Sequence, residues 1–525
     1  MLEPATGVKE GLLDDLRQSL GPSAVSDNSD VLTKMGTDLF TWDGLEQPSA
    51  MVSPTNTDDV VSILDIAKSH GRPIYVRGGG MSYTNAYGPT EPDSILLDMG
   101  GLNRIREVDV TNRYIIAEAG CTWKDVADAL KPFNMVVDFP APLSGSHSTV
   151  GGAMSQNIPG GMHGVLGLEV VLPNGSVVRT GSWSSKSHPT PFLRNYGPDV
   201  TGLFTGDSGV FGIKTAASIH IKLCLEGAAY GSFAFESYQD MAEAMIELSP
   251  MDFITRRTGL DPYETANISK VGLGDAIKTV AATVGGGMTL SSGIRSAAKL
   301  ASGGLNFLKG VKWSLHLKID GVTDRAAEDG MECARKVCLK LGRELPPILP
   351  RARDAVGFSI RKFLGKDGER WVATSSLWSI GRAVEVAREI EGFFEKRSDK
   401  MKKLGIQNSY ITNFSPHYFL CEPCLYWNDS LEPLHLENIS ASESEKFSKF
   451  KPNMEVREYV RELRYELRDF LQDLGSIHVQ IGDFYHFRNV ISPEAADLLS
   501  VLKGALDPEG RINPGKLDGL VPSQK

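Results

Sequence analysis

The amino-acid sequence predicts an α+β protein with more than one domain. Three observations predict this fold class: the length of 525 residues, short apolar runs that alternate with helical patterns over residues 49–225, and longer, proline-richer connections after residue 225. A chain of this length exceeds one ordinary hydrophobic core, so two or three domains are expected. Strands that alternate with helices are typical of α/β and α+β domains.

The predicted elements follow the hydrophobic periodicity along the chain. A leucine stripe at Leu12, Leu13, Leu16 and Leu20 predicts a helix near the N-terminus. Further helices are predicted at 58–67 (capped by Thr57), 122–130, 325–341, 382–404, 458–474 and 493–505. Strands are predicted at 74–76, 94–98, 114–119, 313–319, 410–414 and 477–481, with a hairpin at 168–178.

These elements divide the chain into four parts. We predict an N-terminal helical segment, a first domain, a second domain and a C-terminal segment that returns to the first domain, at residues 1–48, 49–225, 226–454 and 455–525.

Charge and cysteine usage exclude some classes of protein. The formal net charge of −10 argues against a general nucleic-acid-binding protein, which would be basic. The six cysteines are scattered, which is typical of a reducing compartment rather than a disulfide scaffold. We therefore expect a cytoplasmic protein. Cys421 and Cys424 form a lone CxxC pair without a second pair at metal spacing, so no metal site is expected.

The sequence predicts neither a secretory signal nor a membrane span. Residues 265–312 are rich in Gly, Ala and Ser and carry helical spacing. They are interpreted as a packed helix pair, a mobile lid or a helix lying on a membrane surface, so peripheral membrane contact stays open.

Three glycine-rich segments occur within the first predicted domain. Residues 77–83 read RGGGMSY directly after an apolar run, and residues 144–157 and 206–215 also combine glycines with small hydroxyl residues. Glycines allow positive φ and close approach of a ligand, and bare N–H groups in such turns bind phosphate oxygens. Three such segments favour a site for a long, phosphate-bearing cofactor. No GxGxxG follows a strand and opens a helix, which argues against a nicotinamide dinucleotide site.

The order of these motifs carries a resemblance to a known family. The motifs are PTNTDDV at 54–60, RGGG at 77–80, IAEAGCT at 116–122, TVGG at 149–152, GLEVVLPNG at 167–175, GDSGVFGI at 206–213 and LDPEGRINPGK at 506–516. In this order they resemble the vanillyl-alcohol oxidase / p-cresol methylhydroxylase family of FAD-linked oxidoreductases. The resemblance implies a PCMH-type FAD-binding domain of two α/β subdomains. It also implies an α+β cap domain with an antiparallel sheet flanked by helices.

The resemblance implies FAD as the cofactor and assigns residues to it. The cofactor-binding residues expected by position are Arg77, Gly78, Gly79, Gly80, Met81, Ser82, Tyr83, Ser144, His147, Ser148, Thr149, Gly151, Gly152, Gln156, Asn157, Gly209, Gly212, Ile213, Asn513 and Lys516. Many relatives tether FAD through a histidine at the position that Met81 occupies here, so noncovalent FAD is expected. His417 is the leading candidate for a covalent bond, and His147 is a weaker one.

Catalytic candidates come mainly from the predicted strand 477–481 and its surroundings. Period-2 alternation places His478 and Gln480 on one face of that strand. Histidine is a suitable general base near neutral pH. Tyr485 and His417 complete the set of candidates.

The expected activity is hydride transfer from an alcohol, phenol or related small organic substrate to flavin N5. The electron acceptor would be O₂, a quinone or a protein, and a homodimer fits the family. One alternative is a 2-hydroxy-acid dehydrogenase that passes electrons to a quinone or protein. Another is a non-redox, membrane-associated flavoprotein that resembles the alkyl-glycerone-phosphate synthases.

Overall fold

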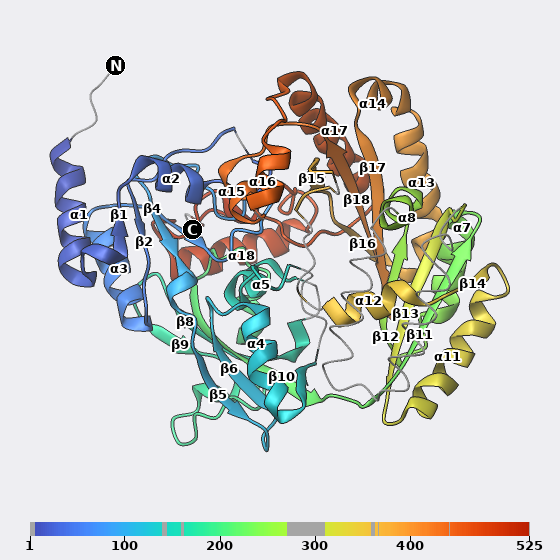
Figure 1. The fold of residues 1–525 in the computed structure, drawn as a ribbon. Helices are drawn as coiled ribbons and strands as arrows, with labels where there is room; N and C mark the ends of the chain where they lie inside the picture. The colour runs from blue at the N-terminus through green and yellow to red at the C-terminus, as the bar shows by residue number, and fades with distance from the viewer. Residues whose placement is uncertain are drawn as a thin grey trace. The chain divides into compact units, whose positions relative to one another are not determined.

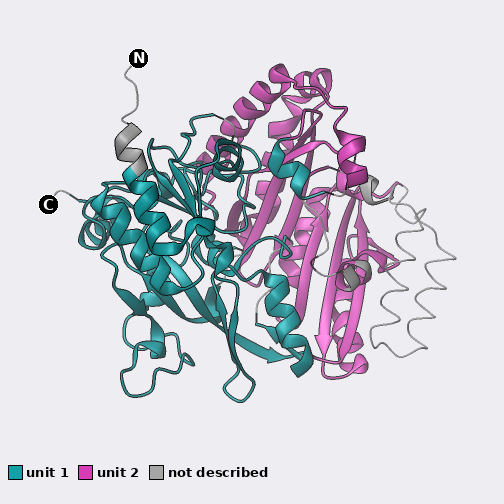
Figure 2. Cartoon of the chain, turned by 60° about the vertical axis from the view of Figure 1, so that its left-hand side comes forward, with its two compact units in different colours: residues 1–224, 432–439, 479–525 teal, residues 225–431, 440–478 magenta. Residues whose placement is uncertain are grey.

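The structure is a computed structural model that describes residues 6–41, 43–138, 144–158, 162–269, 310–356, 358, 363–365, 367–439 and 441–523. Most of the segment 265–312, for which a membrane-surface helix was one interpretation, lies outside these residues. The chain forms two compact units, coloured separately in Figure 2. Unit 1 comprises Met1–Cys224, Glu432–Ile439 and Val479–Lys525, and unit 2 comprises Leu225–Leu431 and Ser440–His478.

Unit 1 contains two sheets (Figure 1). The first has the order β1-β2-β4-β3, formed by Val25–Ser26, Ala50–Val52, Ile95–Asp98 and Ile74–Arg77. Strands β2, β4 and β3 are parallel, and β1 pairs antiparallel with β2. Helices α1 (Thr6–Leu20), α2 (Ser29–Gly36) and α3 (Thr57–Ser69) accompany this sheet.

The second sheet of unit 1 is antiparallel. Its order is β5-β6-β10-β8-β9, with β7 beside β10, and the strands are Ile105–Asp109, Tyr114–Glu118, Ile213–Leu223, Val165–Val171, Val177–Arg179 and Met135–Val137. The helices that follow or precede these strands are α4 (Trp123–Leu130), α5 (Val150–Gln156) and α6 (Val200–Leu203). The predicted hairpin at 168–178 is confirmed as β8 and β9.

The C-terminal chain completes unit 1. After α15 (Pro433–Glu437), it contributes α18 (Pro493–Leu506) and α19 (Lys516–Gly519). Ile512 bridges Ile74 of β3 in parallel, and the Ile74 N–H donates to the Arg511 carbonyl at 2.8 Å. A segment more than 400 positions away in sequence therefore extends the first sheet.

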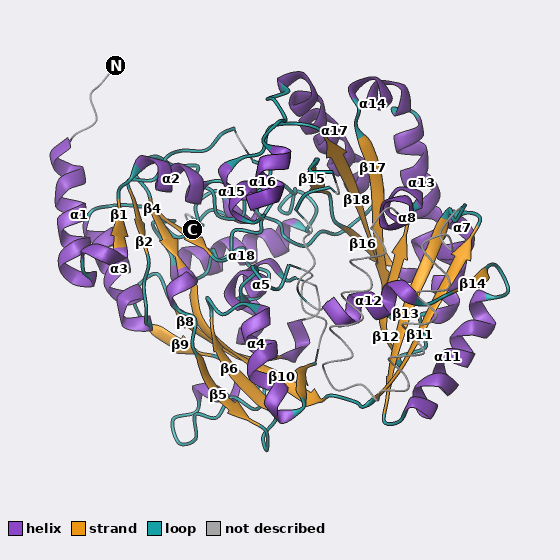
Figure 3. Ribbon diagram, viewed as in Figure 1, coloured by secondary structure: helices purple, strands orange, loops and turns teal. Residues whose placement is uncertain are grey.

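Unit 2 is built on one antiparallel sheet, drawn in orange in Figure 3. Its order is β14-β11-β13-β12-β17-β18-β15, with β16 beside β18, and the strands are Arg343–Leu345, Gly227–Phe235, Trp313–Gly321, Ile254–Leu260, Gln407–Phe414, Tyr418–Trp427, Arg370–Ala373 and Ser376–Ser379. Its described helices are α7 (Tyr238–Leu248), α8 (Pro262–Ser269), α11 (Asp324–Cys338), α12 (Ile348–Val356), α13 (Ala383–Glu395), α14 (Ser398–Leu404), α16 (Ala441–Phe447) and α17 (Met454–Asp473). The predicted α+β fold class, with an antiparallel sheet flanked by helices, is confirmed.

Apolar burial explains why the predicted helices form. Leu12 and Leu16 are fully buried in the core beneath the first sheet, together with Val60 and Ile63 of α3. Burying such a side chain stabilises the fold by about 1.5–3 kcal/mol. The leucine stripe predicted near the N-terminus therefore faces the core, although Leu20 at the end of α1 is only partly buried.

Three predictions of local structure are wrong. The cap of α3 is Asn56, whose side chain accepts from the Asp59 N–H, whereas Thr57 is the first helical residue. The predicted helix 382–404 is two helices, α13 and α14, which are separated at residues 396–397.

The third correction concerns the predicted strand 477–481. Only Ile477 forms a β-bridge there, and it pairs with Leu377. The backbone then turns at Gln480, with φ of +57°, and again at Gly482, also with φ of +57°. Strict alternation fails as a result: Ile477 is 67% exposed while Val479 and Ile481 are buried.

Candidate cofactor site

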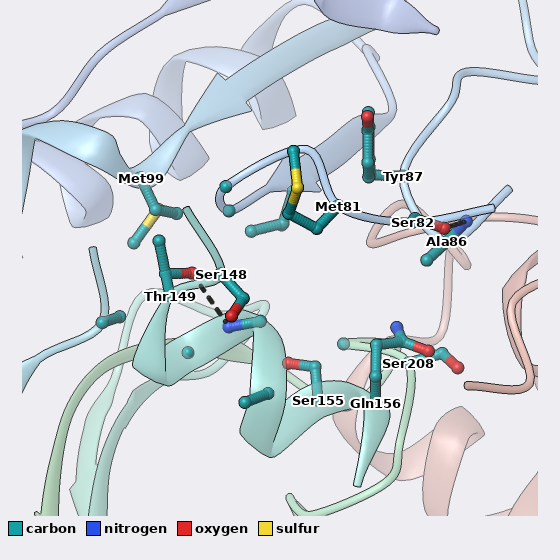
Figure 4. A pocket seen from close by; sticks show the side chains of 18 of the residues that line it. Met81, Ser82, Ala86, Tyr87, Met99, Ser148, Thr149, Ser155, Gln156 and Ser208 are labelled. Atoms are coloured by element: carbon teal, nitrogen blue, oxygen red, sulfur yellow. Dashed lines mark hydrogen bonds between the residues drawn. The ribbon is translucent and has the colours of Figure 1, made fainter. Parts of the chain in front are cut away.

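A cavity in unit 1 is lined by all three glycine-rich segments and by residues from the C-terminal chain. Its lining residues are Val76, Gly78, Gly79, Gly80, Met81, Ser82, Thr84, Ala86, Tyr87, Met99, Ala119, Ser144, Ser148, Thr149, Gly151, Gly152, Ala153, Ser155, Gln156, Ile158, Ser208, Gly209, Gly212, Ile213, Lys214, Gln480 and Asn513. Side chains of this set are drawn in Figure 4.

The triple-glycine loop leaves the end of β3 and runs against the backbone of the second segment. A β-carbon at Gly79 would lie 1.8 Å from the His147 carbonyl oxygen, and one at Gly78 would lie 2.5 Å from Thr149 Oγ1. Gly80 has φ of +75°, a conformation that favours glycine. The loop therefore needs glycine for both close approach and backbone shape, and it presents bare backbone to the cavity.

Arg77 is held inside the fold rather than at the cavity surface. It is buried, its Nη1 donates to the Gly78 carbonyl at 3.1 Å, and it lies 3.5 Å from Asp98 Oδ1. Its guanidinium also lies over the Tyr87 ring, 5.6 Å from the centroid. The Tyr87 hydroxyl donates to the Gly80 carbonyl at 3.2 Å. These contacts make Arg77 a support for the loop.

The second segment leads into helix α5. Thr149 caps this helix, with Oγ1 accepting from the N–H three residues later at 3.3 Å. In Figure 4, Ser155 and Gln156 lie on α5 at one side of the cavity and Met81 on the glycine loop lies at the other. The capped helix thus carries polar side chains to the cavity.

The third segment is fixed by a buried ion pair. Lys214 Nζ lies 2.6 Å from Asp207 Oδ1, and both side chains are almost fully buried. The same carboxylate oxygen accepts from the Gly209 N–H at 2.9 Å. A buried charge is tolerated only when it is paired and hydrogen-bonded, so this pair determines the conformation of the turn.

Asn513 joins three separate parts of the cavity wall. It is buried with φ of +46°, its Oδ1 accepts from the Val76 N–H at 2.8 Å, and its Nδ2 donates to the Ser208 carbonyl at 2.9 Å. Its own N–H donates to the Ile74 carbonyl at 2.8 Å. One amide side chain therefore holds β3, the third glycine-rich segment and the C-terminal chain together.

Unpartnered polar atoms provide a test of whether this cavity suits FAD. In the described residues, Thr84 Oγ1, Gln156 Oε1, Ser208 Oγ and Gln480 Oε1 are buried without a hydrogen-bond partner, and all four residues line the cavity. Buried polar atoms without partners are costly and rare in folded proteins. A ligand rich in hydroxyl, amide and phosphate groups, as FAD is, would satisfy them, so the residues present fit this cofactor.

Most predicted cofactor residues line this cavity. They are Gly78, Gly79, Gly80, Met81, Ser82, Ser144, Ser148, Thr149, Gly151, Gly152, Gln156, Gly209, Gly212, Ile213 and Asn513.

The other predicted cofactor residues are not among the lining residues. Tyr83 is buried, and Asn157 ends α5 with φ of +52°. Burial lowers the pKa of His147, so its imidazole is neutral at pH 7. Lys516 Nζ donates to the Gly88 carbonyl at 2.8 Å and lies 3.2 Å from Asp483 Oδ2. Like Arg77, these residues support the cavity rather than line it.

Several lining residues carried no signal in the sequence. They are Val76, Thr84, Ala86, Tyr87, Met99, Ala119, Ala153, Ser155, Ile158, Ser208 and Lys214. Ala153, Ser155, Ser208 and Lys214 lie inside the segments singled out as glycine-rich but were not assigned to the cofactor. The others come from strand ends and loops that meet only in the fold.

The catalytic candidates are not brought together by the described contacts. Gln480 lines the cavity, and its N–H donates to the Gln156 carbonyl at 3.1 Å. Tyr485 is fully buried in unit 1, with its ring 4.7 Å from that of Phe484. Gln480 is therefore the one candidate of the four among the described lining residues.

The two histidines of the set lie in unit 2. His478 Nδ1 lies 2.6 Å from the Ser375 carbonyl oxygen, and its Nε2 lies 3.0 Å from Ser476 Oγ. His417 is exposed between β17 and β18, with its ring 5.3 Å from that of Tyr418.

The described residues also bear on metal binding and on membrane spans. They contain no group of three or more His, Cys, Asp or Glu side chains arranged to hold a metal ion. Within the same residues, no helix is long and apolar enough to cross a membrane. None of the six cysteines forms a disulfide in the described residues.

Comparisons with known proteins define the class of this chain. Residues 48–181 match the family described as FAD binding domain. The chain is 29% identical over 293 residues to the glycolate oxidase subunit GlcD of Bacillus subtilis (strain 168), a match that covers 52% of this chain and 58% of that protein. The chain thus spans less than two thirds of the length of the curated relatives it matches.

Two solved structures share the whole fold. p-Cresol methylhydroxylase with substrate bound aligns with a TM-score of 0.74 and 19% identity over 99% of this chain and 98% of that chain. The isoeugenol complex of 4-ethylphenol oxidase from Gulosibacter chungangensis aligns with a TM-score of 0.75 and 19% identity over 99% of each chain. The chain therefore has a PCMH-type FAD-binding domain with an antiparallel-sheet cap. The predicted resemblance to the vanillyl-alcohol oxidase / p-cresol methylhydroxylase family is confirmed.

Proposed function

We propose that this protein is an FAD-linked oxidoreductase that oxidises a small organic substrate, an alcohol or a phenol. The observation that carries the proposal is the cavity of unit 1, where three glycine-rich segments meet around unpartnered polar atoms. The match of residues 48–181 to the FAD binding domain family supports the same cofactor.

The residues of the cavity have separable tasks in this proposal. Bound FAD supplies a two-electron acceptor. The backbone of residues 78–82 and 208–209 would bind its phosphates, because N–H groups in such turns attract anions. Gln156 and Gln480 would satisfy polar ring atoms and so orient the cofactor. The apolar side chains of Met81, Met99 and Ile213 would exclude water from it.

The direct test is the flavin content of the protein and its reduction by substrates. Purified protein supplied with FAD should retain flavin after gel filtration and show its absorbance. Under anaerobic conditions, at least one member of a panel of alcohols and phenols should bleach that absorbance. A protein that takes up no FAD contradicts the proposal, and so does flavin that no member of the panel reduces.

A second candidate is oxidation of a 2-hydroxy acid with a quinone or protein as the electron acceptor. The similarity to the glycolate oxidase subunit favours it. Adding 2-hydroxy acids to the same anaerobic panel separates the two candidates. Bleaching by a hydroxy acid, with slow reoxidation by O₂ and fast reoxidation by a quinone analogue, would select this second candidate.

The general base stays a proposal that mutagenesis can test. If His478 takes the substrate proton, His478→Ala should slow flavin reduction about 100-fold while FAD stays bound, the size typical of general acid–base loss. His188→Ala, at an exposed histidine of unit 1, should leave the rate unchanged and serves as the control. An equal rate in both variants would remove His478 from the mechanism and direct attention to Gln480 and Tyr485.

A further inference from the structure

The sheet of unit 2 has one polar face. The proposed function assigns no role to the residues on it. The opposite face is mostly apolar: a β-carbon at Gly231 of β11 would meet Met331 of α11, and one at Gly259 of β12 would meet Met245 of α7. On the polar face, helix α12 packs against β11 and β13, beside which Figure 1 shows it. The two faces are thus covered by different helices and carry different chemistry.

A row of polar side chains crosses four strands of this face. Ser232, His316, Thr258 and Asn413 are register partners on β11, β13, β12 and β17. Ser232 Oγ lies 2.8 Å from His316 Nδ1, and Thr258 Oγ1 donates to Asn413 Oδ1 at 3.1 Å. The row is internally hydrogen-bonded, and its side chains on β11, β13 and β12 are buried, with His316 5% exposed.

The neighbouring row on the same face carries two cations, and both form ion pairs with carboxylates. Tyr230, Lys318 and Arg256 are register partners on β11, β13 and β12. Asp354 of α12 accepts from the Tyr230 hydroxyl at 2.7 Å, and it lies 2.9 Å from Lys318 and 3.1 Å from Arg256. Lys318 also pairs with Asp320 at 2.9 Å. Two cations and two carboxylates therefore balance in this row.

Helix α12 adds two arginines that form no ion pair with an acid of the described residues. Arg353 donates from Nη1 to Thr258 Oγ1 at 3.0 Å, and the guanidinium of Arg351 lies 4.7 Å from the centroid of the Tyr230 ring. Both side chains are partly buried. In the described part of the chain, neither has a carboxylate within ion-pair distance. An arginine carries five N–H donors, so most of the donors of Arg353 have no acceptor among the described residues.

We propose that Arg353 is the centre of an anion-binding site that takes a carboxylate or phosphate group of a small molecule, and that Arg351, two residues away on α12, adds positive charge to it. The guanidinium fork matches the paired oxygens of these groups and binds them bidentately. Thr258 and Asn413 orient Arg353 from the first row, and the Asp354 cluster orients α12 from the second. The inference rests on the proposed function in one respect, since it narrows the substrate class to molecules that carry such an anion.

Burial supports this assignment. Burial and the nearby charge of Arg256 lower the pKa of Arg353 to about 10, which leaves it charged at pH 7 but poorly solvated. An anion that replaces the missing solvation is therefore bound more strongly than at an exposed arginine. His316 stays neutral beside it, because burial lowers the pKa of that imidazole to about 3.

The test measures anion binding directly, on the FAD-loaded protein, by titration calorimetry with oxalate in one arm and inorganic phosphate in the other. We expect saturable binding in at least one arm, weakened by added NaCl, and weakened at least tenfold in Arg353→Gln. Arg388→Gln, which removes the same charge from an exposed position on α13, should bind like the wild type. Arg353→Lys keeps the charge without the fork and should bind with intermediate affinity. The two arms separate a carboxylate ligand from a phosphate ligand.

Two results would overturn the inference. One is the absence of saturable binding in both arms, and the other is equal affinity in Arg353→Gln and Arg388→Gln. Thermal unfolding of each variant distinguishes a lost site from a lost fold, and Arg351→Gln provides a second variant if Arg353→Gln does not fold. A protein that binds anions although no substrate reduces its flavin contradicts only the proposed function. A protein whose flavin is reduced but that binds neither anion contradicts only the inference.

Discussion

At the scale of single residues, the cavity of unit 1 depends on glycines, which carry no side chain. Gly79 touches the backbone of His147, and Gly209 touches the amide of Asn513, where a β-carbon would lie 2.4 Å from Nδ2. Gly209 also has φ of +74°. Neither neighbour can move cheaply, because one is backbone and the other holds two hydrogen bonds. These glycines are therefore sites where any substitution acts on the cavity.

Gly79→Ala should abolish flavin retention. The added methyl would force the glycine loop away from the second segment, and such overpacking costs about 1–3 kcal/mol. Flavin per protein after gel filtration and the thermal midpoint measure the two effects. Gly392→Ala, on α13 where nothing lies within 4 Å of the new methyl, is the matched control and should retain flavin fully. Normal flavin content in Gly79→Ala would show that the loop is not a cofactor wall.

The flavin should be released by denaturation. Met81 lines the cavity at the position where a tether would come from the loop, and a thioether forms no such bond. No histidine or cysteine is found among the described lining residues. Precipitation with acid should leave all flavin in the supernatant, and the band on a denaturing gel should not fluoresce. Flavin that stays with the precipitate would instead direct attention to His417, and His417→Ala would then be the decisive variant.

At the scale of elements, the polar row on β11, β13, β12 and β17 links stability to pH. The unfolded imidazole of His316 has an ordinary pKa near 6.5, whereas burial, with repulsion from Arg353, lowers it to about 3 in the folded state. Between these values the unfolded state binds the extra proton. The contribution of His316 is therefore complete above pH 6.5 and is lost as the pH falls toward 3.

His316→Gln should flatten the pH dependence of stability. Below pH 6.5, the free energy of unfolding of the wild type should fall by about 1.4 kcal/mol per pH unit more steeply than that of the variant, since one proton is involved. Urea unfolding at pH 7, 6 and 5 measures the difference, and His188→Gln at an exposed position controls for the loss of a histidine. Parallel curves for wild type and His316→Gln would contradict the assigned pKa.

Elements also show how far local sequence predicts structure. Helix α4 follows the prediction of a helix at 122–130, because the capping box between Thr122 and Asp125 that starts it is local. The strand at 477–481 does not, since alternating residues cannot reveal that Gln480 takes a positive φ. Such a turn is stabilised by contacts with distant residues, including the bond from the Gln480 N–H to the Gln156 carbonyl.

At the scale of the whole molecule, unit 1 is closed by the end of the chain. Lys503 is buried on α18 and donates to Asp507 Oδ2 at 2.7 Å, to the Val210 carbonyl at 2.7 Å and to the Ile512 carbonyl at 3.1 Å. These bonds attach the C-terminal helix to the third glycine-rich segment. The cavity wall in unit 1 thus depends on contacts made by residues 503–513.

A chain that ends after Leu506 should fail to hold FAD. It loses Asn513, which joins β3 to the third segment, and it leaves the buried ammonium of Lys503 without its carboxylate. An unpaired buried charge costs about 3–5 kcal/mol. Flavin content and urea unfolding measure the effect. A chain that ends after Leu520 keeps these contacts and should bind FAD, and equal behaviour of the two truncations would contradict this role of the C-terminal chain.

The sequence by itself determined the class of cofactor and most of its cavity. Glycine spacing in the segments 77–83, 144–157 and 206–215 is local information, because backbone conformation and close approach restrict these positions to glycine and small residues. The tertiary structure decided the rest. It left Arg77 and Lys516 out of the cavity lining and placed Gln480 in it through a turn. It also joined α12 to the polar sheet face, where Arg353 has no acid partner among the described residues. Those positions depend on burial and hydrogen bonds between residues far apart in sequence, which no local pattern records.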